Sequence, residues 1–197
     1  MLTDLPNILT LSRIAAIPLL VLLTAIRVPW ADFGAALLFT LAGITDYFDG
    51  KLARERAQLS DFGRMLDPIA DKLLIGATLM CLIGFHHMPS FGIYPAIIIM
   101  LREILVSGLR EYLADLRIGL PVTKLAKWKT GVQMVALGLL LLGNDGTYFI
   151  AHRYFPIGMI GFALLWLAAA LTLITGWDYL TAGLRHAGAP SSPHRSS

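Results

Sequence analysis

The sequence predicts an all-α integral membrane protein with six transmembrane helices and an active site at the cytoplasmic side. Hydrophobic residues make up 56% of the 197 positions, charged residues only 15%, and the mean hydropathy is +0.69. A soluble domain of this length would be more polar. The apolar residues come in long continuous blocks, which favours spanning helices over the alternating strands of a β-barrel.

Six blocks come near the roughly 20 residues that a helix needs to cross a hydrocarbon core of about 30 Å. They cover residues 8–26, 33–50, 63–85, 93–113, 128–143 and 157–180. We expect Pro18 to kink the first helix, and the short fifth helix to begin upstream of Trp128. Residues 1–185 are expected to form one domain, and the Ser/Pro-rich tail, residues 186–197, to be disordered.

Basic residues between the blocks predict the orientation in the membrane. The loops after the second and fourth blocks and their flanks hold Lys51, Arg54, Arg56, Arg64, Arg117, Lys124, Lys127 and Lys129. The loops on the other side hold Arg27 and Arg153, together with His86 and His87, which we expect to be solvated. The positive-inside rule therefore places both termini in the cytoplasm and the chain in the inner (plasma) membrane, in contact with membrane lipids.

Neither net charge nor cysteine content points to another class of protein. The formal net charge is only +3 and lies in short loops, so no nucleic-acid partner is expected. Cys81 is the single cysteine and lies in an apolar block, which excludes an intramolecular disulfide framework.

Four carboxylates lie at the end of the second block and the start of the third: Asp46, Asp49, Asp67 and Asp71. Residues three or four apart share one face of a helix, so each pair points one way. Four unpaired carboxylates would repel strongly, and Mg²⁺ or Mn²⁺ would remove that cost. The alternative is that they are solvated loop charges, or form ion pairs with neighbouring lysines and arginines.

The whole run resembles the signature of the CDP-alcohol phosphotransferase family. It reads Asp46-x2-Asp49-Gly50-x2-Ala53-Arg54-x8-Gly63-x3-Asp67-x3-Asp71, and every fixed position of the signature is filled. The resemblance implies that the four aspartates hold two metal ions, Mg²⁺ or Mn²⁺, and that Asp71 is also the general base. It implies a CDP-activated lipid donor, foremost CDP-diacylglycerol, with CMP as the leaving group, and a homodimer.

Two segments supply candidate donor-binding residues. Gly50, Arg54 and Ser60 match motif-region positions that contact the CDP moiety in relatives, and Gly63 leaves room for close approach of a ligand. The run Pro6-Asn7-Ile8-Leu9-Thr10-Leu11-Ser12-Arg13 resembles a segment that borders the nucleotide in the family. Asn7 and Thr10 could instead cap a helix, whereas Arg13, inside an apolar block, is expected to have a phosphate or carboxylate partner.

Two further segments supply candidate acceptor-binding residues. Arg102 and Arg110 lie in the fourth block and either bind an acceptor phosphate or form an ion-pair network with nearby glutamates. Lys127 and Lys129 precede the fifth block, where a Lys/Trp cluster is commonly an interfacial anchor. Here, however, the Lys-x-Lys-Thr-x-x-Gln run resembles that of phosphatidylglycerophosphate synthases, which implies glycerol 3-phosphate as the acceptor. The resemblance extends over about residues 5–140, and the last block adds little to it.

Two alternatives stay open. The same chemistry could use another acceptor, namely inositol phosphate, serine or phosphatidylglycerol, because the aspartate motif reads the donor. A cation or proton transporter would also place acidic residues in a membrane protein. A transporter relay, however, needs them near the bilayer midplane or on both sides, whereas these cluster at one end.

Overall fold

The computed structural model describes residues 5–56, 61–115, 124–153 and 155–187. Six α-helices and one short 3₁₀-helix account for nearly all of this part of the chain. They are α1 (Leu5–Ile26), α2 (Pro29–Arg56), α3 (Asp61–Gly84), η1 (Ser90–Gly92), α4 (Ile93–Asp115), α5 (Lys124–Ala151) and α6 (Ile157–Ala187). The predicted all-α architecture is confirmed. Of the tail predicted to be disordered, residues 186–197, the first two residues belong to α6, and the rest lie outside the described residues.

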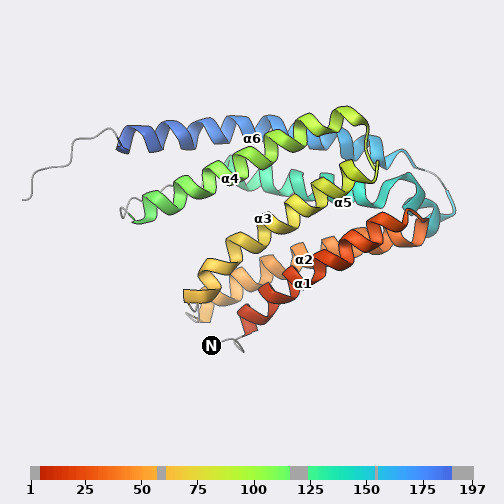
Figure 1. Cartoon of the computed structure of the whole chain (residues 1–197), viewed down its shortest axis with the longest axis horizontal. Coiled ribbons are helices and arrows are strands. Elements are labelled where there is room, and N and C mark those ends of the chain that lie inside the picture. Colours follow the sequence, from red (N-terminus) through yellow and green to blue (C-terminus); the bar gives the residue numbers. More distant parts are fainter. Residues whose placement is uncertain (1–4, 57–60, 116–123, 154, 188–197) are drawn as a thin grey trace, which may run out of the picture.

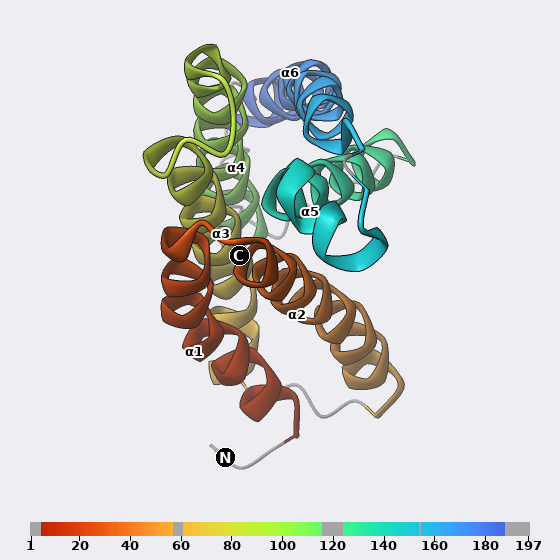
Figure 2. The same cartoon turned by 90° about the vertical axis from the view of Figure 1, so that its right-hand side faces the viewer.

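Successive helices run in opposite directions through an elongated bundle (Figure 1). α1 packs against α2 and α3, α2 packs against α5, and α6 packs against both α5 and α4. The view along the bundle shows α1, α2 and α3 on one side and α4, α5 and α6 on the other (Figure 2). The start of α1, the end of α2 and the start of α3 therefore lie at the same end of the molecule as the end of α4, the start of α5 and the end of α6 (Figure 1).

Among the described residues, four helices are long and apolar enough to cross a membrane. These spans are Asn7–Ile26, Ser90–Ala114, Leu125–Ala151 and Ile157–Thr181. α2 and α3 are long as well, with 28 and 24 residues, but their charged residues gather at one end and lower the hydropathy. Large apolar side chains such as Leu22, Leu101 and Met159 are more than 60% exposed, as expected of a surface that faces lipid.

Small residues let the helices approach closely in the core. Alanines such as Ala35, Ala136 and Ala168 are fully buried among leucines of neighbouring helices. At Gly161 of α6, an added Cβ would lie 3.1 Å from the backbone oxygen of Ala136 in α5. This contact requires glycine, which is how transmembrane helices commonly pack.

The fifth helix differs from a straight span. It begins at Lys124, upstream of Trp128 as expected, and it is broken at Gly143, where φ is +56° and ψ is −176°. Glycine adopts this conformation without a steric penalty. The predicted end of the fifth block at residue 143 therefore coincides with a kink, after which the helix continues to Ala151.

One expectation for the opposite end of the bundle is wrong. His86 is exposed, but the His87 side chain is only 8% exposed, and its Nε2 lies 3.1 Å from the carbonyl oxygen of Thr24. The same nitrogen lies 4.0 Å from Oδ1 of the buried Asp32. His87 therefore ties the α3–α4 turn to the ends of α1 and α2 instead of facing solvent.

Candidate functional site

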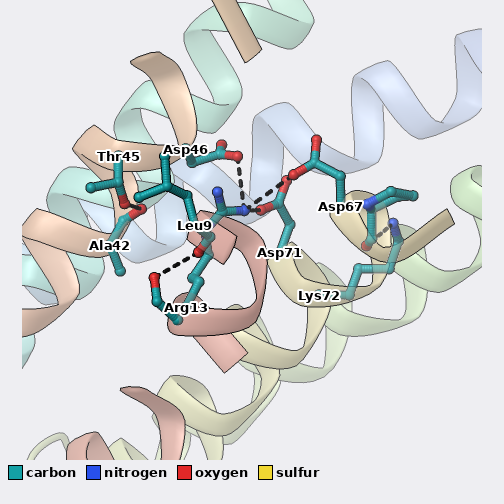
Figure 3. Close-up of polar contacts among 10 residues, drawn as sticks. Leu9, Arg13, Ala42, Thr45, Asp46, Asp67, Asp71 and Lys72 are labelled. Carbon is teal, nitrogen blue, oxygen red and sulfur yellow. Dashed lines mark hydrogen bonds and ion pairs between the residues drawn. The ribbon is translucent and has the colours of Figure 1, made fainter. Parts of the chain in front are cut away.

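Three of the four aspartates of the motif surround a single guanidinium group. Nη1 of Arg13 lies 2.6 Å from Oδ1 of Asp71, 2.8 Å from Oδ1 of Asp46 and 3.5 Å from Oδ1 of Asp67 (Figure 3). The Arg13 side chain is only 1% exposed, whereas the three carboxylates are 37–46% exposed. The site is thus open on the carboxylate side and closed behind the arginine.

Local sequence explains how each helix contributes. Asp67 and Asp71 are one turn apart on α3 and face the same way, as the spacing predicts. Asp46 approaches from α2, and Arg13 from α1, which packs between the two. The prediction that Arg13 has a carboxylate partner is confirmed, and a buried arginine with three such partners avoids the cost of an unpaired charge in an apolar bundle.

The three carboxylates fit a divalent cation. One oxygen from each of Asp46, Asp67 and Asp71 lies within 4.8 Å of the other two. Hard carboxylate oxygens at this spacing suit Mg²⁺ or Mn²⁺, which bind through a few carboxylates and complete their shells with water and phosphate. The guanidinium of Arg13 already shows that the cluster attracts a cation at its centre.

Removing the charge of Arg13 should therefore destabilise the metal-free protein more than the metal-bound protein. We expect Arg13→Gln to lower the melting temperature strongly without metal, because three carboxylates then face one another unneutralised. Mn²⁺ should restore much of the loss by supplying the missing charge. Thermal unfolding in detergent, with EDTA or with Mn²⁺, measures both states. Arg13→Lys, which keeps the charge, is the control, and an equal loss in both states would contradict the expectation.

The other donor-site candidates lie around this cluster or outside the described side chains. Asn7 and Thr10 lie within α1, after its start at Leu5, and are 2% and 4% exposed on the face that also carries Arg13. Gly63 is buried in the first turn of α3. Asp49, Gly50 and Arg54 lie in the last turns of α2, where the structure describes the backbone only, and Ser60 lies outside the described residues.

A second polar cluster joins α4, α5 and α6. Lys129, 3% exposed, donates to Oε1 of Glu103, which also lies 3.9 Å from Nη1 of Arg102. Nη2 of Arg102 donates to Oγ1 of Thr175 in α6 at 3.0 Å. Three of the four acceptor-site candidates, Arg102, Arg110 and Lys129, thus lie on facing helices, and part of the ion-pair network expected as the alternative is present as well.

Lys127 lies elsewhere on α5. It is exposed and lines an apolar hollow with Trp128, Gly131, Val135 and Leu164 among its neighbours. Two residues correspond to about 200° around a helix, so Lys127 cannot share the face of Lys129. This position fits an interfacial anchor better than it fits the Arg102–Glu103–Lys129 cluster.

Sequence reasoning missed residues that link the two clusters. Lys72, which donates to the Pro68 carbonyl at 3.0 Å, lies within electrostatic range of both Asp71 and Arg110. In α6, the ring of Tyr179 lies under two guanidinium groups. A signal for α6 existed, because its polar residues Thr172, Thr175 and Tyr179 recur at helical spacing in an otherwise apolar block.

Known proteins resemble the chain over almost its whole length. The family model of CDP-alcohol phosphatidyltransferase matches residues 3–174. A CDP-diacylglycerol–glycerol-3-phosphate 3-phosphatidyltransferase of Rickettsia bellii is 47% identical over 91% of this chain and 94% of its own length. A protein of the same name from Shigella flexneri is 41% identical over the same shares.

A solved structure shares the fold. The Mycobacterium tuberculosis phosphatidylinositol phosphate synthase in complex with manganese and citrate aligns with a TM-score of 0.62 and 20% identity, over 98% of this chain and 87% of that one. This likeness shows that the two chains share the helical fold. With the motif complete, the family model matching residues 3–174 and these relatives aligned over nine-tenths of its length, the chain belongs to the CDP-alcohol phosphatidyltransferase family.

Proposed function

We propose that the protein transfers a phosphatidyl group from CDP-diacylglycerol to glycerol 3-phosphate, giving phosphatidylglycerophosphate and CMP. The observation that carries this function is the 41–47% identity, over nine-tenths of the chain, to proteins that bear the corresponding name. The two polar clusters support it, because one is acidic and suits metal-bound diphosphate, while the other is rich in cations and suits an anionic acceptor.

In this reaction a hydroxyl oxygen of glycerol 3-phosphate attacks the phosphorus that carries the diacylglycerol. The new O–P bond forms, the phosphoanhydride bond to CMP breaks, and the hydroxyl proton passes to the carboxylate of Asp71. Two Mg²⁺ or Mn²⁺ ions held by Asp46, Asp49, Asp67 and Asp71 would neutralise charge on the diphosphate and the leaving CMP. Arg54 is our candidate for binding donor phosphate because of its motif position, while Arg13 neutralises the carboxylates beside it.

The membrane setting follows the same proposal. We place all six helices in the inner membrane, with the aspartates facing the cytoplasm, because the basic loops lie at that end. A lipid-anchored donor and a water-soluble acceptor can then meet at the membrane surface. A homodimer remains a prediction from the family resemblance.

The decisive experiment is an acceptor panel. Purified protein is incubated with CDP-diacylglycerol and Mn²⁺ or Mg²⁺, together with glycerol 3-phosphate, inositol phosphate, serine or phosphatidylglycerol, and CMP release is followed. Glycerol 3-phosphate should give by far the fastest release. Faster release with any other acceptor would replace the proposed one while leaving the donor chemistry in place. Absence of release with all four would remove the transferase function.

The position of the cationic residues predicts which of them bind acceptor. We expect Arg110→Ala to raise the KM for glycerol 3-phosphate by about 10- to 100-fold, since one charge-assisted contact is worth about 1.5–3 kcal/mol. The KM for CDP-diacylglycerol should change little. The matched control is Lys127→Ala, which also removes a positive charge at this end of the bundle. It should raise the KM for glycerol 3-phosphate clearly less, because Lys127 lies beside the apolar hollow. Steady-state kinetics with each substrate varied in turn measures both; equal KM values in wild type and Arg110→Ala would withdraw Arg110 from the acceptor site.

A further inference from the structure

We propose that one turn of α6, residues 175–179, positions the acceptor-binding arginines, with the ring of Tyr179 as the surface on which Arg102 and Arg110 are held. The inference rests on the proposed function, because it assigns these arginines to an anionic acceptor. It concerns the helix to which the sequence motifs assign no role.

The first observation is that two guanidinium groups converge on one ring. Cζ of Arg102 lies 5.6 Å, and Cζ of Arg110 5.7 Å, from the centroid of the Tyr179 ring. The two arginines are eight residues apart on α4, about 12 Å along the helix axis. Both therefore bend toward the same point on α6, and cation–π attraction offsets part of the repulsion between them.

The second observation is that the same turn of α6 makes room for Arg102. Oγ1 of Thr175 accepts a hydrogen bond from Nη2 of Arg102 at 3.0 Å, and itself donates to the carbonyl of Leu171. At Gly176 an added Cβ would lie only 2.9 Å from Cγ of Arg102. A hydrogen-bond acceptor, a missing side chain and an aromatic ring thus form a recess that fixes one rotamer of Arg102.

The third observation is that Arg102 keeps an N–H group that could donate a hydrogen bond to a ligand. Arg102 Nε is buried and, within the part of the chain that the structure describes, has no hydrogen-bond partner. Tyr179 is only 4% exposed, whereas Arg110 is exposed. The two arginines beside the ring, Arg110 and Arg102, therefore form a cationic path from the surface into the bundle. Lys129 and Lys72 lie near this path, and Lys72 also lies near Asp71. A phosphate held by Arg102 and Arg110 would bring its hydroxyl-bearing end toward the aspartates.

The inference assigns a positioning role to the ring and predicts a split between the two substrates. Tyr179→Leu removes the ring and should raise the KM for glycerol 3-phosphate about tenfold, with the KM for CDP-diacylglycerol unchanged. Tyr179→Phe keeps the ring and should stay within about threefold of wild type. A turn that only ties α6 to α4 would instead lower thermal stability and leave the acceptor KM unaltered.

Glycine substitutions give an independent test. Gly176→Ala would push Arg102 out of its recess and should raise the acceptor KM in the same selective way. Gly108→Ala on α4 is the control, because a Cβ there meets nothing within 4 Å and the kinetics should match wild type.

The wild-type reaction separates the failure of this inference from that of the proposed function. If wild type releases CMP with glycerol 3-phosphate, the function stands and the variants report on α6 alone. The positioning role is then overturned if Tyr179→Leu leaves the acceptor KM unchanged, if Phe is as damaging as Leu, or if both KM values rise together. If wild type does not use glycerol 3-phosphate, both proposals fall.

Discussion

Replacing Asp46 or Asp67 by Asn should reduce turnover by at least about 10³-fold. A bound metal supplies several kcal/mol of transition-state stabilisation, and about 1.4 kcal/mol corresponds to a factor of ten in rate. The amide keeps the shape of the side chain but loses the charge that binds the cation. Both residues lie within 3.5 Å of Arg13, at the point where a cation is already held.

The measurement combines kinetics with metal binding. CMP release is followed over a range of Mn²⁺ concentrations, and bound Mn²⁺ is counted by electron paramagnetic resonance. Asp49→Asn should behave like Asp46→Asn, because the two residues lie one turn apart on α2. Asp145→Asn, an exposed acid on α5, is the control and should keep full activity. Full activity of Asp46→Asn at low Mn²⁺ would rule out the metal site.

Replacing Asp71 by Asn should remove turnover while largely preserving donor binding. A general base contributes roughly 10²- to 10⁴-fold to the rate, and it need not contribute to donor affinity. Of the three carboxylates, Asp71 makes the shortest contact to Arg13, 2.6 Å (Figure 3). Because Asp71 is also a proposed metal ligand, some weakening of Mn²⁺ binding is expected, smaller than the loss in turnover.

Binding and chemistry must be measured apart for this variant. Equilibrium binding of CDP-diacylglycerol in detergent, with Mn²⁺ present, reports donor affinity, and single-turnover CMP release reports the chemical step. Loss of turnover with donor affinity within a few-fold of wild type supports the base role. Near-normal turnover of Asp71→Asn would exclude Asp71 as the base, and loss of donor binding in proportion to turnover would make it a metal ligand alone.

Local patterns in the sequence were sufficient for most of the fold. Apolar blocks of about 20 residues identified all six helices, because backbone groups in lipid must be paired within one segment. The upstream start of α5 also followed from block length, whereas the expected end at residue 143 proved to be a kink, after which the helix continues to Ala151. Four of the helices meet the criteria for a membrane span; α2 and α3 carry the charged ends that make the site, which is why hydropathy alone ranks them lower.

The aspartate cluster could also be predicted from the sequence, because residues three or four apart on a helix share a face. That Asp46 meets Asp67 and Asp71 required that α2 and α3 both pack against α1 and that the end of α2 and the start of α3 lie at the same end of the bundle. Because an unpaired charge is costly inside an apolar block, the sequence also predicted that Arg13 has an anionic partner, either a phosphate or a carboxylate. The tertiary structure shows that the partners of Arg13 are the three carboxylates of Asp46, Asp67 and Asp71.

The sequence by itself therefore determined the helices, the family motif and the faces on which charged residues lie, because all of these depend on spacing within one segment. Only the tertiary structure decided that α6 meets α4, so that Tyr179 lies beside Arg102 and Arg110, and that Lys129 faces Glu103 while Lys127 does not. It also turned His87 inward toward Thr24. Such pairings depend on which helices fit together in shape, at small residues such as Gly161 and Gly176, and no single helix carries that information in its own pattern.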